Sequence, residues 1–103
     1  SMSIIHCQQV AYFYVKSNNP VLAEYYINKT SIGNESLEYF YTFTCIMSLL
    51  GKIDKAFEAL EQVAKMGYDY TWMQKDPDLA PLRAQTDRWT ALMKKYFPEK
   101  FKD

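Results

Sequence analysis

Glycine and proline are scarce in this sequence, which has three glycines and four prolines among its 103 residues. Both residue types mark turns and helix ends, so a chain with few of them has few places to turn. Those present fall at plausible ends of elements, as at Pro20, Gly51 and Gly67. Their distribution predicts long helices joined by short turns.

Residue types that bind metals are equally few. His6 is the only histidine, and the two cysteines, Cys7 and Cys45, are far apart in the sequence. A structural zinc site needs about four such ligands, so we expect no metal site. Both cysteines fall within apolar stretches and are expected to be buried as small hydrophobic residues.

The sequence also lacks a net charge, because 12 basic residues balance 12 acidic ones. This balance removes the attraction that usually drives binding to nucleic acid or to anionic membranes, so neither is an expected partner. No stretch approaches the roughly 20 apolar residues that cross a bilayer, and we expect no membrane insertion. Cytoplasmic and periplasmic locations are both compatible with this sequence.

Motifs of catalysis are missing as well: there is no glycine-rich phosphate loop, GxSxG elbow or HExxH pair. His6 lies in an apolar stretch near the N-terminus and is not expected to act as a general base. Glu35 and Glu38 stand at a predicted helix start, and Asp76 and Asp78 flank a proline turn, where capping explains acidic residues. We therefore expect no enzyme, no catalytic residues and no cofactor.

Apolar and aromatic side chains are abundant, at 49% and 17% of the residues. They suffice for a packed interior, and the length fits one domain of roughly 100–150 residues, so we predict a single all-α domain over 1–103. Asn34 is expected to cap the third helix of this domain. Apolar residues at helical spacing predict helices over about 3–16, 20–29, 35–50, 53–66 and 86–97, with short turns over about 70–74 and from 77 onward.

The first two helix pairs repeat. One constant offset places Asn18 on Gly51 and Ala23 on Ala56. This offset lies close to the period of about 34 residues that is typical of stacked antiparallel helix pairs, each of which buries its apolar face against its neighbours. Ala23 and Ala56 are therefore expected to occupy equivalent crevices.

Leu49–Leu60, with the sequence LLGKIDKAFEAL, resembles the turn and second helix of a tetratricopeptide repeat (TPR), with Gly51 and Ala56 matching best. The stretch from Gly67 to Arg83 is similar to the ending of many bacterial TPR-containing proteins. The resemblance implies a short right-handed superhelix of helix-turn-helix units, about 3–30 and 34–66, with a degenerate unit and capping helices over about 68–97. The residues expected on the inner face of this closing segment are Trp72, Leu79, Leu82 and Trp89.

The same resemblance implies a binding groove. In TPR proteins the first helix of each pair lines a groove for a peptide or protein partner, which here implies Gln8, Tyr12, Val15, Tyr41, Cys45 and Ser48. Tyr12 and Cys45 stand where the subtype that binds chaperone tails needs asparagine, so that ligand is not expected. Tyrosine suits recognition, but simple packing of Tyr12 and Tyr41 between helices stays open, as does the ligand class.

The first predicted helix is apolar almost all round, which predicts packing on more than one side. Ile5 and Phe13 mark this second surface. It would meet either an upstream repeat of a larger protein or a second copy of the chain as a homodimer. Homo-oligomerisation is therefore the alternative function, and a regulatory domain within a larger enzyme is the third.

Overall fold

The computed structural model describes residues 4–30 and 36–102, without the side chains of residues 4 and 5. Within these ranges the chain forms helices and turns and no strand, which confirms the all-α prediction. No helix of this described part combines the length and the apolar character needed to span a bilayer. In order, the elements are α1 (Ile4–Lys16), α2 (Pro20–Ile27), α3 (Leu37–Leu49), α4 (Ile53–Lys65), α5 (Tyr70–Met73), η1 (Pro77–Leu79), α6 (Ala80–Arg83), α7 (Thr86–Tyr96) and η2 (Pro98–Phe101).

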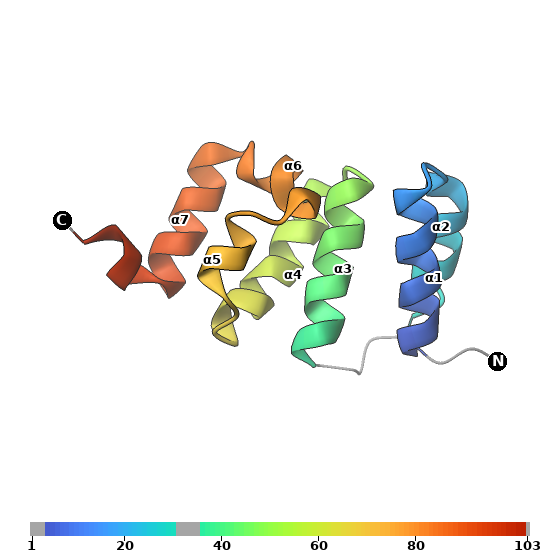
Figure 1. The fold of residues 1–103 in the computed structure, drawn as a ribbon, viewed down its shortest axis with the longest axis horizontal. Coiled ribbons are helices and arrows are strands. Elements are labelled where there is room, and N and C mark those ends of the chain that lie inside the picture. The colour runs from blue at the N-terminus through green and yellow to red at the C-terminus, as the bar shows by residue number, and fades with distance from the viewer. Residues whose placement is uncertain (1–3, 31–35, 103) are drawn as a thin grey trace.

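The helices form an elongated row that measures 51 × 26 × 19 Å, with α1 and α2 near one end and α7 near the other (Figure 1). Two helix hairpins, α1–α2 and α3–α4, meet through α1 and α3. The closing elements η1 and α6 pack on α3, while α7 packs on α4 and α6. Helix α3 therefore lies at the junction of all three parts.

The two hairpins turn in the same way. Asn18 and Gly51 have backbone φ angles of 60° and 78°, in the left-handed region. In both turns the amide of the next residue donates to a carbonyl of the preceding helix, at 2.8 Å in the first hairpin and 2.9 Å in the second. Glycine adopts this conformation without steric cost, and asparagine tolerates it. Ala23 and Ala56 are both fully buried, so the predicted repeat spacing is present in the turns and in the small residues.

The start of α3 differs in detail from the prediction. Its first residue is Leu37, and the Ser36 hydroxyl accepts the amide of Tyr39 at 3.0 Å. Asn34, the predicted cap, lies outside the described residues. Gly67, with a φ angle of 73°, follows the end of α4 as the predicted stop.

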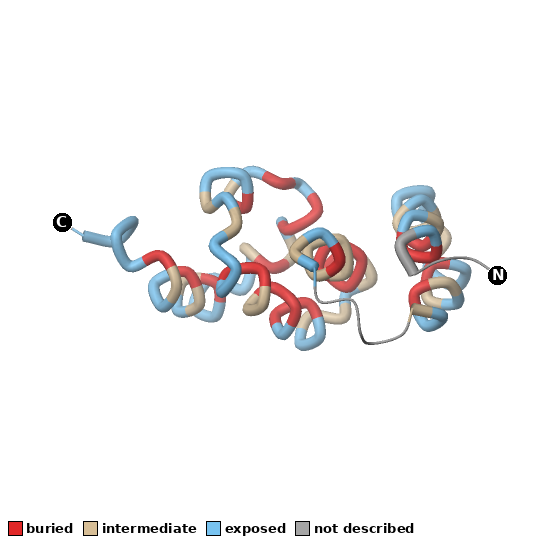
Figure 2. The backbone as a smooth tube through the Cα atoms, turned by 90° about the horizontal axis from the view of Figure 1, so that it is seen from below, coloured by how far each residue is buried: buried red, intermediate tan, exposed pale blue. Residues whose placement is uncertain are grey.

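The core lies mainly between the second hairpin and the closing elements, and Figure 2 shows buried backbone positions along their inner sides. Leu79, Leu82 and Trp89 are buried there, as predicted. Trp72 was predicted for the same face, but its exposed fraction is 44%, so that prediction is wrong. The reason is the single turn of α5, which directs Met73 and not Trp72 into the core.

Candidate functional site

A cleft opens between α1, α3 and the segment that joins α5 to η1. Its volume is about 580 Å³. Helices α1 and α3 are the first helices of the two hairpins, and the α5–η1 segment passes beside both. The cleft is lined by Gln9, Tyr12, Lys16, Glu38, Tyr41, Thr42, Cys45, Trp72, Asp76, Pro77 and Asp78.

Three of the six predicted groove residues line this cleft: Tyr12, Tyr41 and Cys45. They come from α1 and α3, the helices for which the resemblance to TPR proteins implies a groove. Cys45 and Cys7 are buried free thiols, as predicted. The Tyr41 ring also packs on the Tyr68 ring, with 4.5 Å between the ring centroids.

The other three predicted groove residues have different surroundings. Gln8 is buried, and its Nε2 donates to the carbonyl of Tyr39 at 3.1 Å, which joins α1 to α3. Ser48 is also buried, and its Oγ donates to the carbonyl of Asp78 at 2.7 Å. Val15 is partly buried and does not line the cleft.

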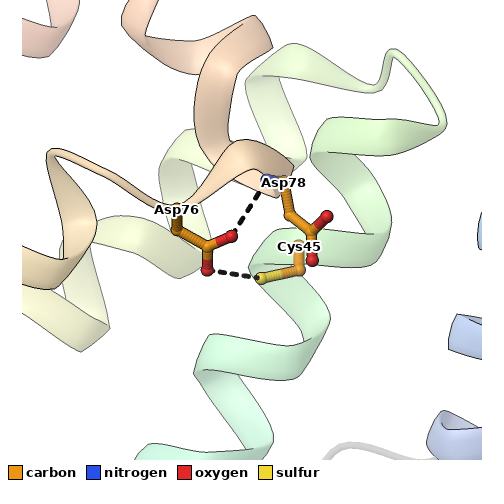
Figure 3. A group of neighbouring side chains, drawn as sticks. All are labelled: Cys45, Asp76 and Asp78. Atoms are coloured by element: carbon orange, nitrogen blue, oxygen red, sulfur yellow. Dashed lines mark hydrogen bonds between the residues drawn. The ribbon is translucent and has the colours of Figure 1, made fainter.

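Two aspartates on one short turn supply two of the three carboxylates that line the cleft. Asp76 caps η1 by accepting the amide of Asp78 on its Oδ1 at 2.9 Å, and Pro77 begins the helical turn between them. Only 5% of Asp76 and 6% of Asp78 is exposed. Figure 3 shows both carboxylates beside Cys45 of α3. The turn thus holds two buried carboxylates next to each other.

Tyrosine hydroxyls bind these carboxylates from two different helices. Tyr12 of α1 donates its hydroxyl to Asp78 Oδ2, and Tyr41 of α3 donates its hydroxyl to Asp76 Oδ2. Lys16 Nζ donates to Asp78 Oδ1 at 2.8 Å. Hydrogen bonds to a charged group are stronger than those between neutral groups, so the turn is anchored to both hairpins.

Arg83 holds the same turn from the α6 side. Its guanidinium donates to the carbonyls of Met73 and Asp76, each at 2.8 Å. These bonds satisfy the carbonyl of the last residue of α5 and add a second donor to the Asp76 carbonyl, which also accepts the Leu79 amide at 3.1 Å. The position of the two carboxylates is therefore fixed from three sides.

The environment of the cleft keeps its phenols and its thiol protonated. Burial, and then the hydrogen bond to Asp76, raises the pKa of Tyr41 well above its usual value. Burial and the bond to Asp78 do the same to the pKa of Tyr12. Burial, followed by the charge of Asp76, raises the pKa of the Cys45 thiol. At neutral pH all three groups are neutral hydrogen-bond donors.

The donor atoms of Cys45, Asp76 and Asp78 lie within 4.8 Å of one another. A zinc site takes about four ligands and a deprotonated thiol. Within the described part of the chain, only three candidate ligands come together here, and both carboxylates already make hydrogen bonds. Among the described residues this cluster is thus better suited to binding through hydrogen bonds and charge.

Three of the four acidic residues that the sequence suggested line the cleft, namely Glu38, Asp76 and Asp78. Glu38 lies in the first turn of α3, is exposed and lines the cleft. Glu35 lies outside the described residues, and His6 is exposed and not part of the cleft wall. Capping accounts for Asp76 as predicted, but its second carboxylate oxygen binds Tyr41, which no local pattern indicated.

In comparisons with protein-family models, curated proteins and solved structures, no match to this chain was found. The resemblance to tetratricopeptide repeats stays a prediction.

The raised pKa of Tyr41 predicts a specific loss of stability in alkali. In the unfolded chain a tyrosine ionises near pH 10, whereas folded Tyr41 keeps its proton. The stabilisation is thus complete below about pH 10 and is lost as the pH rises above it. By about pH 11 the free energy of unfolding, from urea titrations, should fall by up to about 1 kcal/mol more in the parent than in Tyr41→Phe, after allowing for solvent screening.

Tyr25→Phe is the control, because Tyr25 is exposed on α2 and outside the cleft. This replacement leaves the surroundings of Tyr41 in place, so the alkaline loss of stability attributed to Tyr41 should remain. Parallel pH curves for the parent and Tyr41→Phe would contradict the described environment of Tyr41.

Proposed function

We propose that this chain is a protein-interaction module that binds a peptide or protein segment in the cleft between α1, α3 and the α5–η1 segment. The observation that carries the proposal is the aromatic wall of that cleft. Tyr12 and Tyr41 line it, and Trp72 stands beside them with 44% of its surface exposed. Tryptophan and tyrosine are enriched where proteins bind each other with high affinity.

The chemistry of the cleft favours binding over catalysis. A general base works best with a pKa near the operating pH, whereas the pKa values of Tyr12, Tyr41 and Cys45 are all raised above their usual values. Groups that hold their protons in this way serve as hydrogen-bond donors. Supporting this view, α1 and α3 are the first helices of two hairpins with equivalent turns, the arrangement expected of a TPR-like groove.

Selection from a random peptide display library, followed by affinity measurements with calorimetry, tests this proposal. Trp72→Ala should lower the affinity for the selected peptides by about tenfold or more, because removing an exposed tryptophan from a binding surface removes a large contact area. The substitution leaves the core intact. Tyr25→Ala removes an exposed aromatic residue of α2 and should leave the affinity unchanged.

Failure to select any peptide would count against the proposal. Equal peptide affinity of the parent and Trp72→Ala would show that the peptides do not bind in the cleft.

A second candidate function is self-association through the outer face of α2 and the neighbouring part of α1. Phe13, predicted for such a surface, is 63% exposed. The side chain of Ile5, the other predicted residue, lies outside the described residues. Val21, Leu22 and Tyr25 of α2 are exposed as well, so large apolar side chains gather at this end of the molecule.

The repeat register indicates that a further stacked hairpin would not cover the α2 residues. The positions one repeat later, in α4, carry charged, exposed side chains, although the second hairpin has neighbours on both sides. Equivalent positions of α2 would therefore also face outward in a longer stack. A second copy of the chain, which presents the same apolar surface, fits better. The equivalent pairs are Val21 and Asp54, Leu22 and Lys55, and Tyr25 and Glu58.

The triple variant Val21→Asp, Leu22→Lys and Tyr25→Glu copies the α4 residues onto α2. Sedimentation velocity over a range of concentrations should show dimers of the parent and monomers of the variant, because charged side chains oppose an apolar interface. Circular dichroism checks that the variant remains helical. A parent protein that stays monomeric at every concentration would rule out this second function.

A further inference from the structure

We infer that the partner segment inserts an arginine side chain into the cleft between α1, α3 and the α5–η1 segment. This inference rests on the proposed binding function and names the chemistry of its ligand. The acidic and basic side chains that line the cleft are Glu38, Asp76, Asp78 and Lys16, so by formal charge three carboxylates face one ammonium group. The cleft therefore carries an excess of negative charge, although the chain as a whole carries none.

Among the buried groups, the excess is located on Asp76. The Asp78 carboxylate is paired with Lys16 at 2.8 Å, but Asp76 has no ion pair within the part of the chain that the structure describes. Its partners are the Tyr41 hydroxyl, the amide of Asp78 and, at 4.0 Å, the Cys45 thiol, all of them neutral donors. A buried carboxylate without a counter-ion is costly. A cation from a partner would supply the missing charge.

Lys16 provides an internal example of how the cleft holds a cation. Its ammonium group binds Asp78 Oδ1 and lies 5.8 Å from the centroid of the Tyr12 ring. A carboxylate and an aromatic ring thus contact the same positive group. A carboxylate and aromatic rings also line another part of the cleft wall, at Asp76, Tyr41 and Trp72. There a partner would provide the cation.

Arginine suits these features better than lysine. Its guanidinium is planar, stacks on aromatic rings and can donate to more than one acceptor at once. Trp72 lines the cleft with much of its surface exposed, which leaves an aromatic surface for such stacking. Glu38, which is exposed on the first turn of α3, adds a second acceptor within the same cleft.

The inference is tested with two blocked peptides, acetyl-Gly-Arg-Gly-amide and the same peptide with citrulline, which has nearly the same shape but no charge. Each is titrated into the full chain, and the indole signals are followed by NMR. The Trp72 signal should shift, and the signal of buried Trp89 should stay in place as an internal reference. The arginine peptide should bind about tenfold or more tightly than the citrulline peptide.

Two charge variants separate a cation site from an anion site. Lys16→Gln removes the competing ammonium group and should strengthen binding of the arginine peptide roughly threefold, whereas Glu38→Gln should weaken it by a similar factor. Both side chains are exposed. Because Lys16 also binds the buried Asp78 carboxylate, the indole signals of the free Lys16→Gln variant must match those of the parent before the affinities are compared. Lys55→Gln, an exposed lysine of α4 outside the cleft, is the control and should leave the affinity as it is.

Equal binding of the arginine and citrulline peptides overturns the inference, as does weaker binding by Lys16→Gln. The display selection separates this failure from failure of the proposed function. Selected peptides that depend on Trp72 but contain no arginine would overturn the arginine site and leave the binding function in place. If none of the selected peptides depends on Trp72, both the arginine site and the proposed binding function are overturned.

Discussion

Two buried carboxylates, on Asp76 and Asp78, organise the part of this protein where its three segments meet. Tyr12 reaches Asp78 from α1, and Tyr41 reaches Asp76 from α3, so one short turn receives a hydroxyl from each hairpin. Lys16 adds an ammonium group on the α1 side. Because buried charges are tolerated only with close hydrogen-bond partners, the positions of these groups depend on one another.

The hydrogen bonds to these two carboxylates also determine which side chains form the cleft wall. They turn the α5–η1 segment toward α1 and α3, and the two tyrosines that anchor the turn become part of the cleft wall. Burial, and then these hydrogen bonds, raise the pKa of both phenols, so both stay protonated. A surface held in this way is prepared for binding before a partner arrives, which lowers the entropic cost of association.

Much of the fold follows from local patterns. Helical spacing of apolar residues and the few turn residues predict the helices to within a few positions, because both signals act over a few neighbouring residues. Asn18 and Gly51, predicted as equivalent, share the left-handed backbone conformation. The resemblance to TPR proteins implies Tyr12, Tyr41 and Cys45 as groove candidates, because in that family the first helix of each pair lines the groove.

The rest depends on contacts between distant segments, which local patterns do not contain. Asp76 resembles an ordinary cap in the sequence, and only the folded chain brings Tyr41 to its second oxygen. A helix of one turn, such as α5, has too few residues for its spacing to distinguish Trp72 from Met73 as the buried side chain. A double-mutant cycle of Tyr12→Phe and Asp78→Asn, with the free energies of unfolding from urea titrations, tests the central constraint most directly. A coupling energy of about 1–2 kcal/mol is predicted for a hydrogen bond to a buried carboxylate, whereas additive effects would contradict the account.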